Sequence, residues 1–516
     1  MEMNVRTNSM NAVVSSGASP RDWLGLVVLL LPALLVSMDI SILFVASPAI
    51  SQDLAPNATQ WLWMMDSYSL VVASLLVTMG SLADRIGRRR LLMTGAVVFG
   101  AASALLAFAP SPGLFIAGRV LLGVGAATLA PSTLAIVRSI FTDAAQRRKA
   151  VAAWTVAFTG GAVLGPVIGG LLLEQFHWGS VFLINLPVMA LLLIAAPLLI
   201  PESRDPEGAG FDLPGALLSL GMLFGLVYAL KRFAEYGAEP LAWAALTGGL
   251  ILLVLFLAWQ RRAAHPLVDL TLFRRPAFTG AAAANCLAAL TMTGLGLLAF
   301  TYLQSVHEMS PLRASLVALP TFFGTAFGAA LGSALAKNLR PGILVAAGQL
   351  IAAAGMAFIA VTMAAESVWA FIGGYVMLCF GVGLVSTLSN GLILATAPPE
   401  RAGAAASISE TGIHLGGSLG IAGFGTISAA VYRRRMEAEV PGAPEPAAES
   451  IVGAEAVAAE FPVDQAGALL EAAASAFSGA VGAVALTAAV VLLAAAALTG
   501  VLLRRVPAGT LADAEH

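Results

Sequence analysis

Residues 24–46, LGLVVLLLPALLVSMDISILFVA, form the first long apolar run of the chain. The run is long enough to cross a bilayer, because a spanning helix needs about 20 residues. Asp39 is its only ionisable side chain. A charge inside a membrane helix costs about 2.5–3.5 kcal/mol on insertion scales, so it is retained where it faces a partner or a water-filled cavity. Asp39 is therefore the first candidate functional residue.

The composition predicts a polytopic membrane protein. Hydrophobic residues make up 59% of the 516 residues and charged residues only 11%, whereas a soluble domain carries about 25% charged residues. Mean hydropathy is +0.89. Lys and Arg are spread between apolar runs, which argues against a nucleic-acid role. Cys286 and Cys379 lie in apolar runs without metal-ligand or redox spacing, so no disulfide, metal or cofactor is predicted.

Counting the apolar runs predicts an all-α protein with fourteen transmembrane helices. An even number places both termini on one side, and 20 of the 27 Lys and Arg residues fall in segments on that side. The positive-inside rule makes this side cytoplasmic. We therefore expect a multi-pass protein of the cell membrane. The predicted spans lie near residues 24–46, 61–81, 91–109, 113–138, 150–173, 180–200, 213–231, 241–260, 277–303, 313–336, 342–363, 368–394, 402–431 and 478–503.

An internal repeat divides the chain. GSLADRIGRRR follows the second run from Gly80, and a degraded copy, GSALAKNLRPG, follows the tenth from Gly332. This predicts two six-helix bundles with an inserted helix pair between them. The Ala-, Glu- and Pro-rich composition of residues 436–471 predicts an exposed extracellular loop, whose Ala-rich part could form a short helix or hairpin. The predicted parts are a tail at 1–22, a first bundle at 23–200, the insert at 201–276, a second bundle at 277–503 that includes loop 433–477, and a tail at 504–516.

The segment GSLADRIGRRRLL, residues 80–92, resembles the loop shared by the major facilitator superfamily. Gly80 and Gly87 predict close approach and a tight turn, and Asp84 is placed one turn from Arg88 to pair with it. A plain positive-inside anchor is the alternative. The resemblance implies a cytoplasmic gate that opens when the protein faces inward. Its motif positions are Gly80, Asp84, Arg85, Gly87, Arg88 and Arg89.

Two further motifs strengthen the resemblance. GRVLLGVG, with Arg119 inside the fourth run, is similar to the superfamily's helix-4 motif, and GAVLGPVIGG resembles the helix-5 motif of drug antiporters. Ordinary helix packing also explains glycines one turn apart. With the Met-Asp pattern at Asp39, these motifs resemble the fourteen-helix drug:proton antiporters, especially quaternary-ammonium and dye exporters. The fifth-run motif consists of Gly161, Gly165, Pro166, Gly169 and Gly170.

Five acidic or basic side chains lie within the predicted spans. At about 1.5 Å per residue, Asp39, Asp66 and Arg119 fall at a similar level, so a carboxylate pair facing one arginine is geometrically possible. Glu410 lies near the midplane, and His414 follows one turn later. The resemblance implies that Asp39, Asp66 and Glu410 bind cation and proton in turn.

Structural alternatives remain for each of these residues. Asp66 could be a solvated helix end, Arg119 a simple counter-ion and His414 a hydrogen-bonded core histidine. The resemblance also predicts an acid in the tenth helix, where this chain has Thr325, and a second acid in the thirteenth, where it has His414. These departures leave recognition of doubly charged substrates open.

Aromatic residues could hold a planar cation by stacking and cation-π attraction. The interpretation is a monomeric, proton-driven multidrug antiporter that exports lipophilic cations and other amphipathic toxins through the lipid bilayer. Export of one antibiotic or endogenous metabolite is the alternative; uptake, or a membrane enzyme or scaffold, is disfavoured. The candidate pocket residues are Tyr68, Trp154, Phe158, Tyr302, Phe322 and Phe323.

Overall fold

The computed structural model describes residues 18–204, 212–264, 266–365, 367–397, 402–508 and 510, and within these ranges its regular structure is helical. The helices are α1 (Pro20–Leu54), α2 (Ala58–Ile86), α3 (Arg88–Ala107), α4 (Pro112–Ile140), α5 (Ala144–Gln175), α6 (Ser180–Leu183), α7 (Asn185–Leu199), α8 (Leu213–Tyr236), α9 (Pro240–Gln260), α10 (Pro276–Thr301), α11 (Pro311–Leu335), α12 (Pro341–Thr362), α13 (Val368–Thr396), α14 (Ala402–Glu439), α15 (Glu445–Glu449), α16 (Ile451–Ala458) and α17 (Val463–Leu502). Short η helices cover Leu272–Arg274, Tyr302–Val306 and Met363–Ala365.

Thirteen helices among the described residues are long and apolar enough to cross a membrane, and α2 makes a fourteenth when its two parts, bent by 54°, count as one span. In this count α6 and α7 together form one span, and α10 continues through the η helix to Val306. The predicted all-helical fold is confirmed. Helices suit this setting because they satisfy their own backbone polar groups without water.

Helix starts follow local sequence signals. Proline occupies the first position of α1, α4, α9, α10, α11 and α12, where its missing N–H is not needed. Ser19 caps α1 and shares a capping box with Asp22, and Asn57 does the same for α2 with Gln60. These caps satisfy backbone donors that the first helical turn leaves free.

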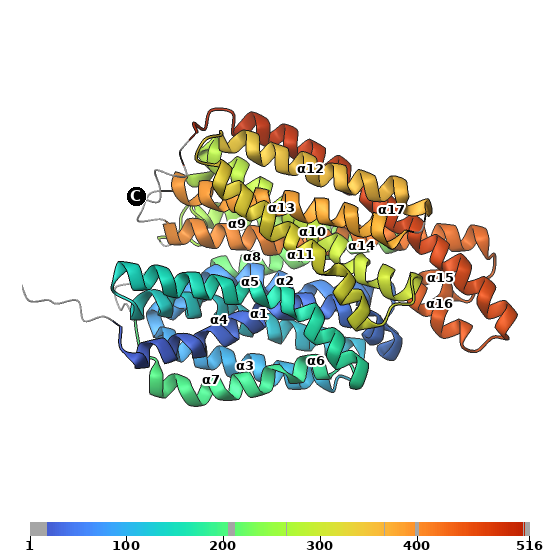
Figure 1. Cartoon of the computed structure of the whole chain (residues 1–516), viewed down its shortest axis with the longest axis horizontal. Helices are drawn as coiled ribbons and strands as arrows, with labels where there is room; N and C mark the ends of the chain where they lie inside the picture. Colours follow the sequence, from blue (N-terminus) through green and yellow to red (C-terminus); the bar gives the residue numbers. More distant parts are fainter. Residues whose placement is uncertain are drawn as a thin grey trace, which may run out of the picture.

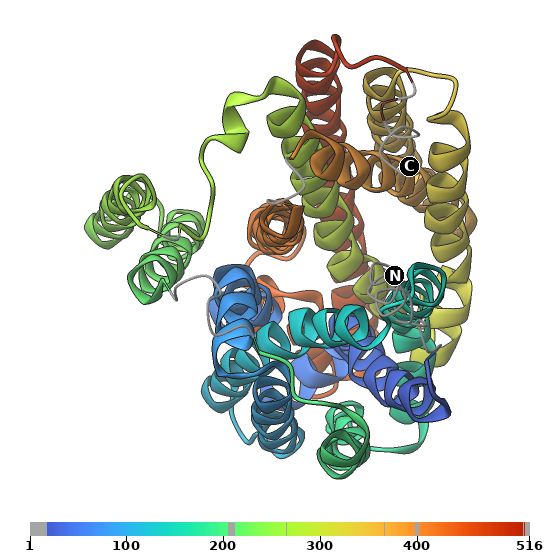
Figure 2. The same cartoon turned by 90° about the vertical axis from the view of Figure 1, so that its left-hand side faces the viewer.

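The helices form two groups that repeat one packing pattern (Figure 1). In the first group, α1 to α7, α1 packs on α5 and α3 on α4; in the second group, α10 to α14 and α17, α10 packs on α14 and α12 on α13. The α8–α9 pair lies outside both groups, where α8 contacts α2 and α14 (Figure 2). The two groups thus have the same pattern of helix–helix contacts. This agrees with the sequence repeat between the segments that begin at Gly80 and Gly332.

The two ends of the helix bundle differ. We call the end where α1 begins and α17 ends the terminal end, and the end that carries α15 and α16 the hairpin end (Figure 1). Hydrogen bonds that join the first group to the second group and to its α15–α16 hairpin lie toward the hairpin end. These bonds join Gln52 to Glu455 (2.8 Å), Gln304 to the Val45 carbonyl (3.0 Å), Ser310 to Glu174 (2.8 Å) and Ser315 to the Pro166 carbonyl (2.7 Å). The groups are therefore fastened at that end.

The predicted loop at 433–477 is largely helical, so its Ala-rich part takes one of the two forms that the sequence allowed, but it is less exposed than expected. Helix α14 runs on to Glu439, α15 and α16 follow, and α17 begins at Val463. Ala447 and Ala454 are buried, and Tyr432 donates a hydrogen bond to the Ala447 carbonyl at 3.0 Å. The Ala- and Glu-rich composition that suggested exposure also favours helix, and the short helices pack against the ends of the long ones.

Candidate functional site

Asp39 on α1 and Arg119 on α4 form a buried ion pair. Nη1 of Arg119 donates to Oδ2 of Asp39 across 2.7 Å, and the two residues are 1% and 2% exposed. The guanidinium also lies 4.6 Å from the ring centroid of Tyr68 on α2, a cation-π distance. Nothing among the described residues accepts a hydrogen bond from Nε of Arg119. The pair holds α1, α2 and α4 together at one level.

Asp66 on α2 pairs with a different cation, Lys231 on α8. Nζ of Lys231 donates to Oδ1 of Asp66 at 2.9 Å and lies 2.9 Å from Oδ2. Both residues are at most 2% exposed. Asp66 is therefore not a solvated helix end, and it does not share Arg119 with Asp39 as the depth estimate suggested.

Sequence reasoning missed Lys231. It placed this lysine at the outer end of a helix over 213–231, whereas α8 continues to Tyr236, more than a turn further. Because the residues after Lys231 continue the helix, a longer predicted helix would have placed this lysine inside the span and not at its end. The site therefore contains two carboxylates and two cations, so its charges balance.

Glu410 on α14 differs from the two aspartates because it is exposed. No hydrogen bond or ion pair joins Glu410 or His414 to another residue within the described ranges. At 100° per residue, both lie on the side of α14 between its α10-facing and α2-facing surfaces. Those surfaces are marked by Gly416, whose Cβ would meet the Cys286 backbone of α10, and by Gly425, whose Cβ would meet Leu62 of α2. Glu410 thus faces the space between the two helix groups.

The fifth-helix glycines bring α5 against α1 beside Asp39. A Cβ on Gly161 would strike the Leu34 carbonyl, one on Gly165 would strike Ser41 and lie 2.9 Å from the Met38 carbonyl, and one on Gly169 would lie 2.5 Å from Ile42. Gly170 instead faces Leu312 of α11, and the Pro166 carbonyl accepts the Ser315 hydrogen bond. The motif therefore contributes to both the α1 contact and the contact between the groups.

In the second group, Gly416 and Gly420 pack against the backbone of α10 at Cys286 and Leu290, as Gly161 and Gly165 pack against α1. The fifth and thirteenth spans therefore pack in the same way within their groups, in agreement with the internal repeat. Gly412 is different, because a Cβ there would meet open space among the described residues.

The loop between α2 and α3 is held within the first group. Nε of Arg88 donates to Asp84 at 2.9 Å, as their spacing predicted. Gly87 has φ +112°, a backbone conformation that favours glycine, and a Cβ on it would lie 2.6 Å from Oε1 of Glu202. A Cβ on Gly80 would meet nothing within 4 Å among the described residues, so close approach is not its role, and Arg85 is exposed.

Glu202, in the segment after α7, also contacts this loop, and the sequence did not indicate it. Its carboxylate accepts from the Arg89 backbone N–H at 3.0 Å, and its other oxygen lies 3.8 Å from Nε of Arg89 and 3.9 Å from Nε of Arg90. Arg89 also donates to the Ile200 carbonyl at 3.0 Å. These contacts join the loop to the segment after α7, and none crosses to the second group within the described ranges.

The six candidate aromatic residues do not form a single cluster. Tyr68 contacts Arg119, and Trp154 stacks on Phe158 with ring centroids 5.2 Å apart. Tyr302 packs 4.7 Å from Phe371. These residues lie on different helices and on different helix faces. Sequence spacing relates residues within one helix only, so it could not show whether they meet.

Phe322 and Phe323 on α11 point in different directions. Phe322 is half-buried, whereas Phe323 is exposed and lines a shallow apolar groove with Phe327 and Phe380. An exposed apolar groove of this kind suits contact with lipid tails. Thr325, where the resemblance predicts an acid, donates to the Thr321 carbonyl of its own helix at 3.2 Å.

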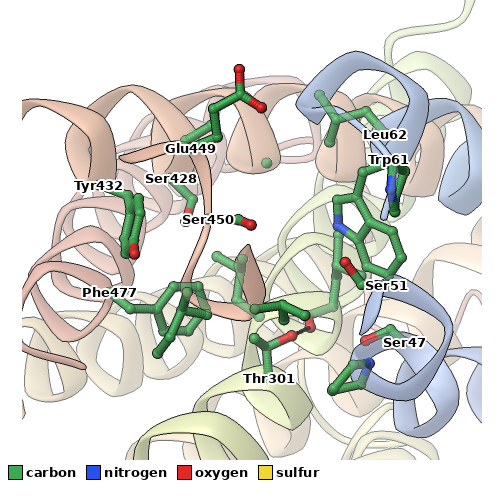
Figure 3. A pocket seen from close by; sticks show the side chains of 18 residues that line it. Ser47, Ser51, Trp61, Leu62, Thr301, Ser428, Tyr432, Glu449, Ser450 and Phe477 are labelled. Atoms are coloured by element: carbon green, nitrogen blue, oxygen red, sulfur yellow. Dashed lines mark hydrogen bonds between the residues drawn. The ribbon is translucent and has the colours of Figure 1, made fainter. Parts of the chain in front are cut away.

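A pocket lies at the hairpin end between the two groups (Figure 3). Its empty volume is about 820 Å³, part of it open to the surroundings. Trp61 lies opposite Tyr432 and Phe477 across it (Figure 3), and Ser450 is among the residues that line it. Aromatic rings and hydroxyl groups together make this lining amphipathic.

Comparisons with known proteins agree with the geometry. Residues 29–421 match the Major Facilitator Superfamily. The chain is 44% identical over 488 residues to the multidrug efflux pump LfrA of Mycolicibacterium smegmatis, covering 94% of this chain and 97% of the relative. It is 34% identical over 462 residues to the methyl viologen resistance protein SmvA of Salmonella typhimurium, covering 89% and 93%.

A solved structure supports the fold alone. The inward-facing, unoccupied bacterial homolog of the human lysosomal transporter Spinster matches with a TM-score of 0.67 at 19% identity, covering 96% of this chain and 99% of that one. The resemblance read from residues 80–92 and from the fourth and fifth helices is confirmed. The chain belongs to the major facilitator superfamily and is a multi-pass membrane transporter.

Proposed function

We propose that this transporter exports amphipathic cations from the cell in exchange for protons. The observation that carries the proposal is the contrast among its intramembrane acids. Asp39 and Asp66 are each neutralised by a buried cation at 2.7 and 2.9 Å, whereas Glu410 is exposed between the two helix groups. Glu410 is thus the acid with a charge left for an incoming cation.

Cation and proton exclude one another at a single carboxylate. A protonated Glu410 has no charge to attract a cation, and a bound cation favours the ionised form. If the two helix groups rock around this residue, it meets each side of the membrane in turn. Proton entry from the outside then releases the cation there, and proton loss inside prepares the site again. His414, one turn away, is placed to take part in the proton transfer.

The direction of transport depends on the orientation of the bundle. Arg138, Arg147 and Arg148 surround an open hollow at the terminal end, and the Arg-rich first turn of α3, residues 88–90, lies at the same end. Basic residues of this density favour the cytoplasmic side. The terminal end is then cytoplasmic, and Glu410 is reached from the cell interior in this conformation, with the pocket at Trp61 on the external side.

The substrate class is supported by chemistry and by the names of relatives. Trp154 and Phe158 stack in parallel, with 13° between ring planes. A stacked aromatic pair of this kind offers a surface on which planar apolar groups can pack. A multidrug efflux pump and a methyl viologen resistance protein are among the relatives. We propose lipophilic and quaternary ammonium cations and dyes as substrates, carried by a single chain in the lipid bilayer.

One observation favours a narrower alternative, the export of one antibiotic or endogenous metabolite. Thr325 provides a hydroxyl group where an additional acid is expected, and its hydroxyl is already bonded within α11. Relatives include a puromycin resistance protein of Streptomyces alboniger, 32% identical over 424 residues and covering 81% of this chain and 84% of that one. Growth protection against several unrelated cationic compounds would separate the two functions.

The test is dye efflux in everted vesicles under an imposed pH gradient. We expect Glu410→Gln to abolish uphill movement and Asp39→Asn to slow it, while Glu460→Gln, an exposed acid between α16 and α17, transports as wild type. Wild-type rates in both Glu410→Gln and Asp39→Asn would show that these carboxylates do not couple transport to protons.

A further inference from the structure

Lys231 lies in a site with the chemistry of a cation-binding pocket. Its ammonium is 2.9 Å from both oxygens of Asp66 and 3.7 Å from the ring centroid of Trp63. Asp66 and Trp63 are three residues apart, on one face of α2. A carboxylate next to an aromatic ring face is an arrangement that attracts alkylammonium groups.

Two more aromatic residues complete this enclosure from α8. Trp63 stacks on Phe224 with ring centroids 5.6 Å apart and 10° between planes, and Tyr228 is 6.4 Å from the same indole ring. Phe224 precedes Lys231 by two helical turns, so both lie on one face of α8. The ammonium is thus surrounded by groups of two helices, one from the first group and one from the inserted pair.

Apolar contacts seal the site toward the terminal end. Leu70 and Ala73 of α2, Leu223 and Val227 of α8, and Ala422 of α14 form one buried cluster. The other charged group that acts on Asp66 is Arg119, which is held by Asp39. A substrate ammonium could reach Asp66 only by replacing the lysine of the chain itself.

We propose that Lys231 is a resident, tethered cation that fills the Asp66–Trp63 site and so removes Asp66 from substrate binding. The inference deepens the proposed function and rests on it, since it assigns cation binding to Glu410 and not to Asp66. Lys231 is accordingly a specificity-determining residue: its side chain decides how many carboxylates an incoming cation can use.

The first experiment measures equilibrium binding of ethidium, a monovalent aromatic cation, to the purified full-length protein by fluorescence. Asp66→Asn combined with Lys231→Met removes both charges of the pair and leaves no buried charge unpaired. We expect this double variant to bind ethidium within about twofold of wild type. A loss of tenfold or more would show that the Asp66–Lys231 site binds the substrate, and would overturn the proposal.

The second experiment tests the vacated site. Lys231→Ala leaves space for a small alkylammonium, so n-propylammonium, which matches the part of the lysine side chain that the substitution removes, should bind to this variant and raise its melting temperature. Wild type, Lys231→Arg and the double variant Asp66→Asn with Lys231→Ala should show no such rise. An equal response in the last variant and in Lys231→Ala would contradict a site built on Asp66.

Failure of the proposed function gives a different result. If Glu410→Gln binds ethidium as wild type does, the assignment of the exchange carboxylate is wrong, yet the n-propylammonium response of Lys231→Ala still reports on the Asp66 site. If Lys231→Ala does not fold, ethidium binding by Asp66→Asn with Lys231→Met decides the proposal alone.

Discussion

Arg119 donates a hydrogen bond to Asp39 across 2.7 Å, from α4 to α1, with both side chains almost completely buried. Two opposite charges removed from water stabilise each other only as a pair, and the loss of either one leaves the other without compensation. This relationship makes Arg119 and Asp39 interdependent in the folded protein.

We therefore expect Arg119→Met to destabilise the protein by about 3–5 kcal/mol, the usual cost of breaking a buried pair. Combining it with Asp39→Asn should restore most of the lost stability, because no buried charge then remains unpaired. Thermal unfolding of the purified single and double variants checks this. Equal melting temperatures for wild type and Arg119→Met would show that the pair does not support the fold.

The α1–α5 contact predicts that alanine is harmful at one of two adjacent glycines and harmless at the other. Gly161→Ala places a methyl group against the Leu34 carbonyl, whereas Gly160→Ala meets nothing within 4 Å among the described residues. Overpacking of a tight interface costs about 1–3 kcal/mol, so only Gly161→Ala should lower the melting temperature and slow transport. If both variants behave alike, α5 does not approach α1 through Gly161.

Gly87 and Gly80 provide a matched pair in the loop between α2 and α3. Gly87→Ala forces a Cβ into a positive-φ conformation and toward the Glu202 carboxylate, and strain of this kind costs about 1–3 kcal/mol. We expect reduced transport and faster proteolysis of this loop in Gly87→Ala. Gly80→Ala should match wild type, and a defect there equal to that of Gly87→Ala would contradict the loop geometry.

The orientation of the bundle can be tested by cysteine labelling. In a background with Cys286→Ser and Cys379→Ser, Glu460→Cys should react with a membrane-impermeant maleimide in intact cells. Arg262→Cys, at the terminal end after α9, should react only in everted vesicles. Both positions are exposed. The reverse pattern would place the chain termini outside the cell and make the proposed direction of transport wrong.

Sequence reasoning succeeded where the signal is local or periodic. The apolar runs predicted the spans, since a helix in lipid must present about 20 apolar residues, and helix rise alone placed Asp39 and Arg119 at one level. The Asp84–Arg88 pair was predicted because the two residues are four positions apart in the sequence.

The rest depends on contacts between distant segments. Lys231 and Asp66 are 165 residues apart, and Glu202 reaches the Arg89 backbone across 113 residues, so no local pattern joins them. The sequence allowed a short helix or a hairpin in the Ala-rich part of residues 433–477 but could not choose between them, because short helices owe their stability to tertiary packing more than to propensity. The charge balance of the site was therefore visible only in the structure.

Proton release on cation binding tests the central claim most directly. When ethidium is added to the purified protein in weakly buffered solution near neutral pH, the account predicts release of protons from wild type and from Glu460→Gln, and none from Glu410→Gln. Ethidium affinity of wild type should also weaken as pH falls, because protons and cation compete for one carboxylate. Undiminished proton release from Glu410→Gln would contradict the assignment of Glu410 as the exchange site.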